Sequence, residues 1–135
     1  MDDKRRKRYL EKTDLVTKRI KDINDWKDGF FVEEKDKLAS YKAFQEIAEA
    51  SLDIIAMMLK DIEKVPEDDY SNINKAIGEG ILPGDYREAL NDLNGLRNRI
   101  VHEYNGLDDR IALNAIEEIL PIIAKFIEVV RRWIQ

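Results

Sequence analysis

The sequence predicts an all-α protein: an antiparallel bundle of four principal helices and one short helix, in a single domain of residues 1–135. Three observations favour this fold class. Apolar residues make up 44% of the chain and charged residues 38%, a balance typical of long amphipathic helices. Only six glycines and three prolines occur, which is too few for a turn-rich β fold. Apolar residues also recur at steps of three and four, the spacing of one helix face.

Two long helices are expected in the first half of the chain. The first should cover Lys4–Trp26 and end near Gly29. The second should cover Val32–Lys64, either continuously or with a break near Asp36, because Pro66 cannot continue a helix. The first stripe consists of Tyr9, Thr13, Val16, Ile20 and Ile23, and the wider second stripe of Phe44, Ala48, Ser51, Ile55, Met58 and Ile62.

A short helix and a fourth, longer one should follow. The short helix is expected over Asn72–Glu79. The fourth begins after Asp85, which together with Glu88 three residues later fits a capping box. It should run to about Tyr104, and Asn105-Gly106 should then supply left-handed conformations that cap its end.

The last helix is expected to begin with Asp108 as its N-cap and to kink at Pro121. Its stretch "ILPIIAKFIEVV" is the most apolar in the chain, but Lys125 and Glu128 interrupt it. No apolar run reaches the roughly 18 residues of a membrane span, and the basic N-terminus lacks the apolar segment of a secretory signal. We therefore expect a cytoplasmic protein that makes no membrane contact.

Composition also excludes several kinds of chemistry. The chain contains no cysteine, which rules out disulfides, thiolate zinc sites and cysteine nucleophiles. It contains a single histidine, which argues against a metal site made from protein ligands. We expect neither a metal ion nor a cofactor.

The net charge of −5 is unevenly distributed. Residues 1–27 carry ten Lys and Arg against six Asp and Glu, whereas the rest carries thirteen against twenty-two. An acidic body binds nucleic acid poorly in general, so no DNA partner is expected and any contact with RNA must be local. It would use either the basic run Lys4–Arg8 or residues that line a cleft, although the run is more simply explained as a solvated, partly frayed helix start.

The stretch "LRNRIVHEYNGLD" carries the most unusual pattern in the chain. At about 100° per residue, Arg97 lies at the centre of the apolar stripe, while His102 lies on the rim of that stripe beside Asn98. A guanidinium that faces a core needs a partner. Glu49 and Asp53, one turn apart on the long second helix, are the candidates. A purely structural Arg–carboxylate bridge explains the pattern equally well.

The same stretch resembles the signature of the HEPN superfamily, in which Arg is followed by four to six residues and then His. It is more similar to the HepT-like branch, whose form is Arg-Asn-x-x-x-His-x-Tyr, here Arg97, Asn98, His102 and Tyr104. The stretch "QEIAEASLDIIAMML" resembles the long second helix of that family, and "IEEILPIIAKF" resembles its closing helix with an internal Leu-Pro. The resemblance therefore covers nearly the whole chain.

This resemblance implies a metal-independent endoribonuclease that is the toxin of a type VII-like toxin–antitoxin pair. Its partner would be a minimal nucleotidyltransferase antitoxin, which attaches AMP to the matching tyrosine, Tyr104, and so silences the nuclease. Arg97 and His102 would be catalytic, with Asn98, Glu49 and Asp53 in support. Two simpler interpretations stay open: Tyr104 could close the helix with its hydroxyl in solvent, and Asn98 could be an ordinary exposed helix residue.

Metal-free RNA cleavage uses the 2′-hydroxyl as the nucleophile, and it needs a base, an acid and a cation. Histidine suits proton transfer near neutral pH, and arginine suits phosphate oxygens. Because each chain has one histidine, we expect a homodimer whose interface forms a composite site, with the stripe around Arg97 serving partly as the seam. The alternatives are a non-catalytic helical dimer that regulates a nucleotidyltransferase or binds a nucleotide, and a purely structural dimer.

Overall fold

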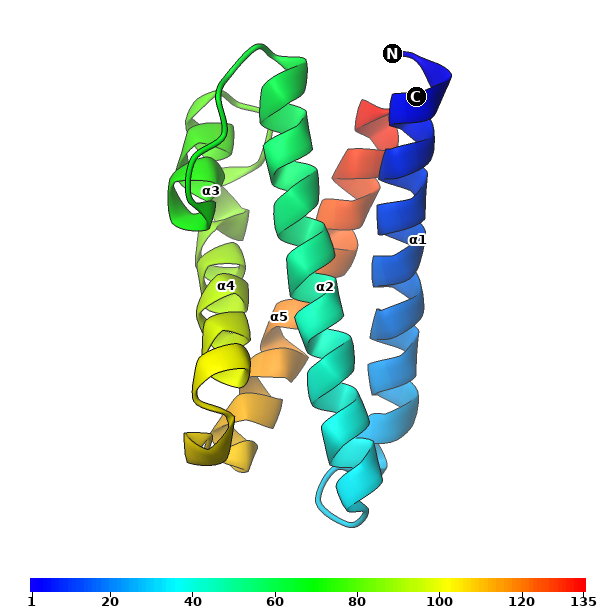
Figure 1. The fold of residues 1–135 in the computed structure, drawn as a ribbon, viewed down its shortest axis with the longest axis vertical. Helices are drawn as coiled ribbons and strands as arrows, with labels where there is room; N and C mark the ends of the chain where they lie inside the picture. Colours follow the sequence, from blue (N-terminus) through cyan, green and yellow to red (C-terminus); the bar gives the residue numbers. More distant parts are fainter.

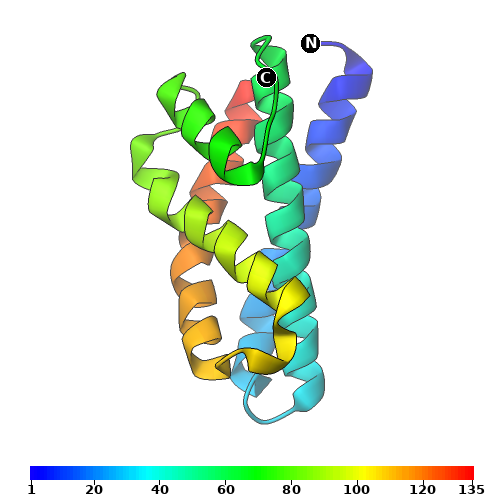
Figure 2. The same cartoon turned by 60° about the vertical axis from the view of Figure 1, so that its left-hand side comes forward.

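The computed structural model describes all 135 residues, Met1–Gln135. Five α-helices make up the fold: α1 (Asp3–Trp26), α2 (Glu34–Asp61), α3 (Asp69–Gly78), α4 (Arg87–His102) and α5 (Asp109–Trp133). The four long helices alternate in direction, and the chain termini lie at the same end of the bundle (Figure 1). Turned by 60°, the molecule shows α4 crossing obliquely over the bundle, with the short α3 beside its start (Figure 2). The predicted all-α antiparallel bundle is confirmed.

The long α2 is continuous through Asp36, so the alternative of a break there is wrong. It also ends three residues earlier than predicted, before Pro66 can act. Glu63 adopts a left-handed conformation with φ 62°, and the backbone N–H of Lys64 donates to Leu59 O at 2.9 Å. A left-handed residue with this back-bond is a common way to end a helix. Glycine usually fills that position, which is why the sequence did not reveal it.

The predicted capping box at the start of α4 is wrong. A 3₁₀ turn over Gly84–Tyr86 precedes the helix, and α4 begins at Arg87 with no side-chain capping bond. Asp85 is exposed on that turn, where the N–H of Tyr86 donates to Pro83 O at 3.2 Å. The 3₁₀ turn thus replaces the cap that an Asp side chain would have supplied.

The end of α4 also differs from the prediction. The helix stops at His102, because Glu103 adopts φ −135° and ψ 32°. Tyr104–Gly106 then forms a separate 3₁₀ turn in which neither Asn105 nor Gly106 is left-handed. Tyr104 therefore lies outside α4, on a short connection to α5.

The start of α5 follows the prediction. Asp108 is the N-cap, and its Oδ1 accepts from the backbone N–H groups of Arg110 and Ile111, both at 3.0 Å. The helix continues through Pro121 to Trp133, and the kink at Pro121 stays a prediction.

One apolar cluster joins all five helices. Its largest fully buried side chains include Tyr9 from α1, Tyr41 and Phe44 from α2, Ile73 from α3 and Phe126 from α5. No helix in the chain is both long enough and apolar enough to cross a bilayer.

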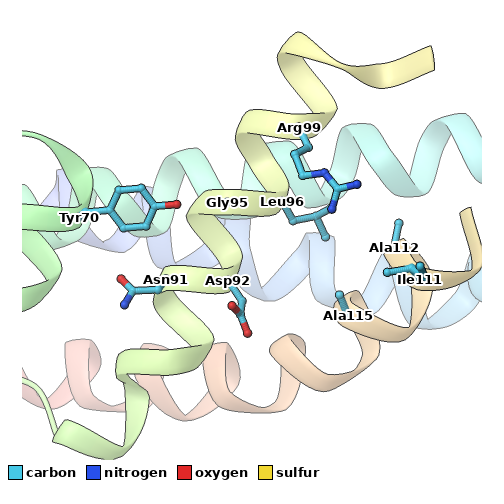
Figure 3. A pocket seen from close by; sticks show the side chains of 9 residues that line it. All are labelled: Tyr70, Asn91, Asp92, Gly95, Leu96, Arg99, Ile111, Ala112 and Ala115. Atoms are coloured by element: carbon cyan, nitrogen blue, oxygen red, sulfur yellow. The ribbon is translucent and has the colours of Figure 1, made fainter. Parts of the chain in front are cut away.

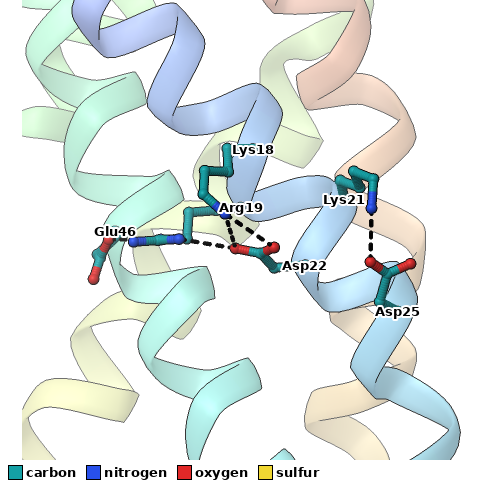
Figure 4. Close-up of polar contacts among 6 residues, drawn as sticks. All are labelled: Lys18, Arg19, Lys21, Asp22, Asp25 and Glu46. Carbon is teal, nitrogen blue, oxygen red and sulfur yellow. Dashed lines mark hydrogen bonds and ion pairs between the residues drawn. The ribbon is translucent and has the colours of Figure 1, made fainter.

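The positive charges of α1 are largely paired. Arg19 donates to Glu46 of α2 at 2.9 Å and to Asp22 at 2.8 Å, while Lys21 donates to Asp25 at 2.9 Å (Figure 4). Within the basic run Lys4–Arg8, the Arg5 side chain is bound to Asp61 and to the carbonyl oxygen of Met57. Figure 1 places this run at the opposite end of the bundle from the end of α4. The basic start of α1 is thus remote from His102.

Candidate functional site

The last turn of α4 presents its polar residues to solvent. His102 is the final helical residue and is exposed, and so is Arg99 one turn earlier. Asn98 is half-buried beside them. The Arg99 side chain has no hydrogen-bond or ion-pair partner and is exposed, so its guanidinium is free to meet a ligand. His102 and Arg99 therefore share an open face of the helix, since residues three apart are neighbours on a helix surface.

Arg97 has a carboxylate partner, as its position in the apolar stripe requires, but not the predicted one. Its Nη2 donates to Asp69 Oδ2 of α3 at 2.8 Å and to Asn94 Oδ1 at 3.3 Å. Glu49 is exposed on α2, and Asp53 pairs with Lys12 of α1 at 3.3 Å. Neither carboxylate reaches Arg97, because the face of α2 that carries Glu49 and Asp53 is turned away from α4. Asp69 was missed because α3 begins three residues earlier than predicted.

Most of the apolar stripe of α4 is core. Leu90 and Leu93 are fully buried, and Ile100 nearly so, within the cluster that joins the five helices. Val101, on the flank of the same stripe, is 44% exposed, and the use of this stripe as part of a dimer seam stays a prediction. The side chain of Arg97 is 20% exposed, and its Nε is inaccessible to solvent and has no hydrogen-bond partner.

Tyr104 is partly buried beneath the end of α4. Its ring packs edge-on against Tyr41 of α2, with ring centroids 5.4 Å apart. Its hydroxyl oxygen is inaccessible to solvent and has no hydrogen-bond partner. The simpler interpretation of Tyr104, with its hydroxyl in solvent, is therefore wrong. Burying a hydroxyl without a hydrogen bond costs free energy. Packing of the surrounding residues must therefore hold Tyr104 in this position.

The surroundings of Tyr104 form a polar cluster that the sequence did not reveal. The Tyr41 hydroxyl donates to Asp109 Oδ1 at 2.6 Å, and the Lys37 ammonium donates to Asp109 Oδ2 at 3.1 Å. Burial and the bond to Asp109 raise the pKa of Tyr41 well above its ordinary value, so it stays a donor. The bond from Tyr41 lowers the pKa of Asp109, and the bond to Asp109 raises the pKa of Lys37. Both partners of the ion pair thus stay charged near neutral pH.

A groove of about 390 Å³ runs along the outer face of α4 beside this site. Figure 3 shows Tyr70 of α3 on one side and Ile111 of α5 on the other, with Arg99 at one end. Gly95 forms the floor, where an added Cβ would stand 3.4 Å from the Tyr70 hydroxyl. The walls are open, since Tyr70 is 44% exposed and Ile111 62% exposed. This face combines the apolar side chains of Tyr70 and Ile111 with the polar side chains of Asn91 and Asp92 and an arginine that has no partner.

Comparisons with known proteins agree on one family. A family model described as "Ribonuclease HepT-like" matches residues 9–130. Two Archaeoglobus fulgidus proteins, each called "Putative RNase", share sequence with the chain. One is 34% identical over 92% of this chain and 91% of its own length, and the other 37% identical over 92% and 94%.

The fold is shared with solved toxin structures. A tri-AMPylated HEPN toxin of Shewanella oneidensis, in complex with an MNT antitoxin, superposes with a TM-score of 0.85 at 21% identity. The match covers 98% of this chain and 99% of that one. A toxin–antitoxin structure with AMP-PNP superposes with a TM-score of 0.84 at 21% identity, over 96% and 99% of the two chains.

Proposed function

The chain belongs to the HepT-like ribonuclease family, and from that premise we propose that it is a metal-independent endoribonuclease, the toxin of a type VII-like toxin–antitoxin pair. The observation that carries the proposal is the exposure of His102, the only histidine, at the end of α4. Arg97 and Arg99 lie on the two preceding turns of the same helix. A proton-transfer group and two cations thus lie within the last two turns of one rigid helix, with His102 and Arg99 on one face and Arg97 turned toward Asp69 of α3.

The proposed reaction uses the substrate's own 2′-hydroxyl. Its oxygen attacks the adjacent phosphorus, the bond from phosphorus to the 5′-oxygen breaks, and a 2′,3′-cyclic phosphate remains. Imidazole can remove the 2′-proton or protonate the leaving 5′-oxygen. A guanidinium can bind the phosphate oxygens as negative charge accumulates on them. On Arg97, Nη2 is bound to Asp69 and Asn94 and Nε is buried, which leaves Nη1 for a phosphate, whereas the exposed Arg99 has no side-chain partner.

The general base must be an unprotonated imidazole and the general acid a protonated one. Because each chain has one histidine, a second copy of the chain would supply the second His102. We place the seam of this homodimer on the outer face of α4, where the exposed side chains of Tyr70 and Ile111 flank the groove and Arg99 lies at its end, one turn before His102. Apolar side chains that gather on one face mark a protein interface more often than single exposed residues do. A two-fold axis near the end of α4 would bring the two His102 residues together.

A charge on the groove wall should break this dimer. Ile111→Glu is expected to shift the protein to monomer in sedimentation velocity, because it would bury a carboxylate in the apolar part of the seam. Val65→Glu is the matched control, since Val65 is 76% exposed on the loop before α3. If Ile111→Glu and Val65→Glu leave the same oligomer, the seam lies elsewhere.

The antitoxin would be a minimal nucleotidyltransferase that attaches AMP to Tyr104. Tyr104 is two residues from His102, so the adduct would bring its phosphate to the place where RNA phosphate must bind. Occupation and like-charge repulsion would then exclude the substrate.

The direct test is cleavage of a defined RNA by the purified protein with EDTA present. The proposal predicts products with 2′,3′-cyclic phosphate ends and no cleavage when the cleavage-site 2′-hydroxyl is replaced by hydrogen. Cleavage that requires added Mg²⁺ would contradict the metal-independent mechanism.

A further inference from the structure

The buried hydroxyl of Tyr104 is difficult to reconcile with its role as an acceptor of AMP. For the transfer, its oxygen must attack the α-phosphorus of ATP: the bond from that oxygen to phosphorus forms, the bond to pyrophosphate breaks, and the phenolic proton leaves to solvent. This attack needs open space in line with the leaving group. The Tyr104 oxygen has no such space, because it is inaccessible to solvent. The observed position of Tyr104 is thus a closed one.

Three side chains from two helices keep it closed. Tyr41 packs edge-on against the Tyr104 ring, and the Tyr41 hydroxyl is fixed by Asp109 at the first turn of α5. Lys37 holds the other oxygen of Asp109. Because both Tyr41 and Lys37 come from α2, this cluster ties the start of α5 to α2 directly behind Tyr104.

The backbone around Tyr104 is held only lightly. The N–H of Gly106 donates to Glu103 O at 2.9 Å, and the N–H of Leu107 donates to Tyr104 O at 3.2 Å, so both bonds lie inside the segment. Only the N–H of Glu103, which donates to Arg99 O at 2.8 Å, ties this backbone to α4. A short segment with few external bonds can open without unfolding the domain. The segment is therefore anchored mainly by two side chains that pack against the core, Tyr104 and Leu107.

We propose that Tyr104 is a gated acceptor, which receives AMP only when the segment Glu103–Leu107 opens, and that Tyr41 and Asp109 set how often it does. This inference rests on the proposed modification of Tyr104. Once AMP is attached, the segment cannot close again, because the closed position has no room for a phosphate and no cation to pair with it there except Lys37, which Asp109 already holds. The modification would therefore trap the open form beside His102.

Nitration by tetranitromethane tests the gate without the antitoxin, since it measures whether each phenol is accessible. The chain supplies its own standards: Tyr70 is 44% exposed and Tyr9 is fully buried. Peptide mass spectrometry of the unmodified full chain should show Tyr104 nitrated at least about tenfold more slowly than Tyr70. Nitration of Tyr104 as fast as that of Tyr70 would overturn the gate.

Tyr41→Phe should open the gate, because it removes the bond to Asp109 but keeps a ring. The expected result is several-fold faster nitration of Tyr104, and Tyr41→Ala should accelerate it further if that variant folds. Tyr9→Phe is a matched control, since the Tyr9 hydroxyl donates to Asp61 at 2.5 Å and so joins the first turns of α1 to the end of α2. Those two helix ends lie at the opposite end of the bundle from the end of α4 (Figure 1). Equal acceleration by Tyr41→Phe and Tyr9→Phe would overturn the role of Tyr41.

The transfer itself is measured with the cognate nucleotidyltransferase and ATP, as AMP-sized mass on the Tyr104 peptide. Tyr41→Phe should raise the initial rate by the same factor as it raises nitration. An unchanged rate would overturn the gating and leave the proposed function standing. AMP found only on other residues, in the parent and in Tyr41→Phe alike, would instead contradict the proposed modification of Tyr104.

Discussion

Replacing His102 by alanine is expected to abolish RNA cleavage and to leave the fold intact. His102 is exposed and makes no hydrogen bond or ion pair, so the free energy of unfolding should change by less than about 0.5 kcal/mol. Loss of general acid–base catalysis should lower kcat by about 10²- to 10⁴-fold. The measurement is single-turnover cleavage of a defined RNA, paired with thermal unfolding of both proteins.

The control for His102→Ala is Glu103→Ala. Glu103 is also exposed and follows His102 directly, so its substitution disturbs the same turn without removing an imidazole. Glu103→Ala should keep the parent's cleavage rate to within a few-fold. Equal cleavage by His102→Ala and the parent, both free of contaminating nuclease, would remove His102 from the mechanism.

Replacing Arg97 by alanine is expected to lower cleavage by about 10²- to 10³-fold, because the transition state loses a cation for which water cannot substitute. It should also destabilise the fold by about 1 kcal/mol, since Asp69 and the buried Asn94 each lose a partner. The two effects are separated by comparison with Asp69→Asn. That variant removes the same ion pair from the other side and keeps the guanidinium.

A catalytic Arg97 predicts that Arg97→Ala loses far more cleavage than Asp69→Asn at similar stability. A purely structural bridge predicts that both variants lose stability and cleavage in parallel. Arg97→Lys adds a third comparison: it keeps the charge but not the planar donor geometry, so it should recover only part of the rate.

Hydrophobic periodicity predicted the architecture because each long helix buries one continuous stripe. The N-cap at Asp108 was also predictable, since a capping side chain bonds within its own first turn. The same rule predicted a wrong N-cap at Asp85, because that residue lies within a 3₁₀ turn that precedes the helix. The local sequence thus predicted which helices form more reliably than it predicted the first and last residues of α4.

Contacts between helices were much less predictable. Helical spacing showed that Arg97 needs an anionic partner, but the choice of Asp69 over Glu49 and Asp53 depends on how α2 and α3 are rotated against α4. The bond from Tyr41 to Asp109 joins residues 68 positions apart, and no local pattern indicates it. The family resemblance singled out His102 and Tyr104 by motif. Only the structure shows that His102 is exposed and that the hydroxyl of Tyr104 is buried.

The most direct test of the composite site is to titrate the parent with inactive subunits. Parent and His102→Ala chains are unfolded together, refolded at varied ratios and assayed for RNA cleavage at constant total concentration. If each site needs His102 from both copies, random pairing at equal ratio should leave about a quarter of the parent's activity, following the square of the active fraction. A linear loss, with about half of the activity left, would mean that each subunit cleaves on its own and would contradict the shared site.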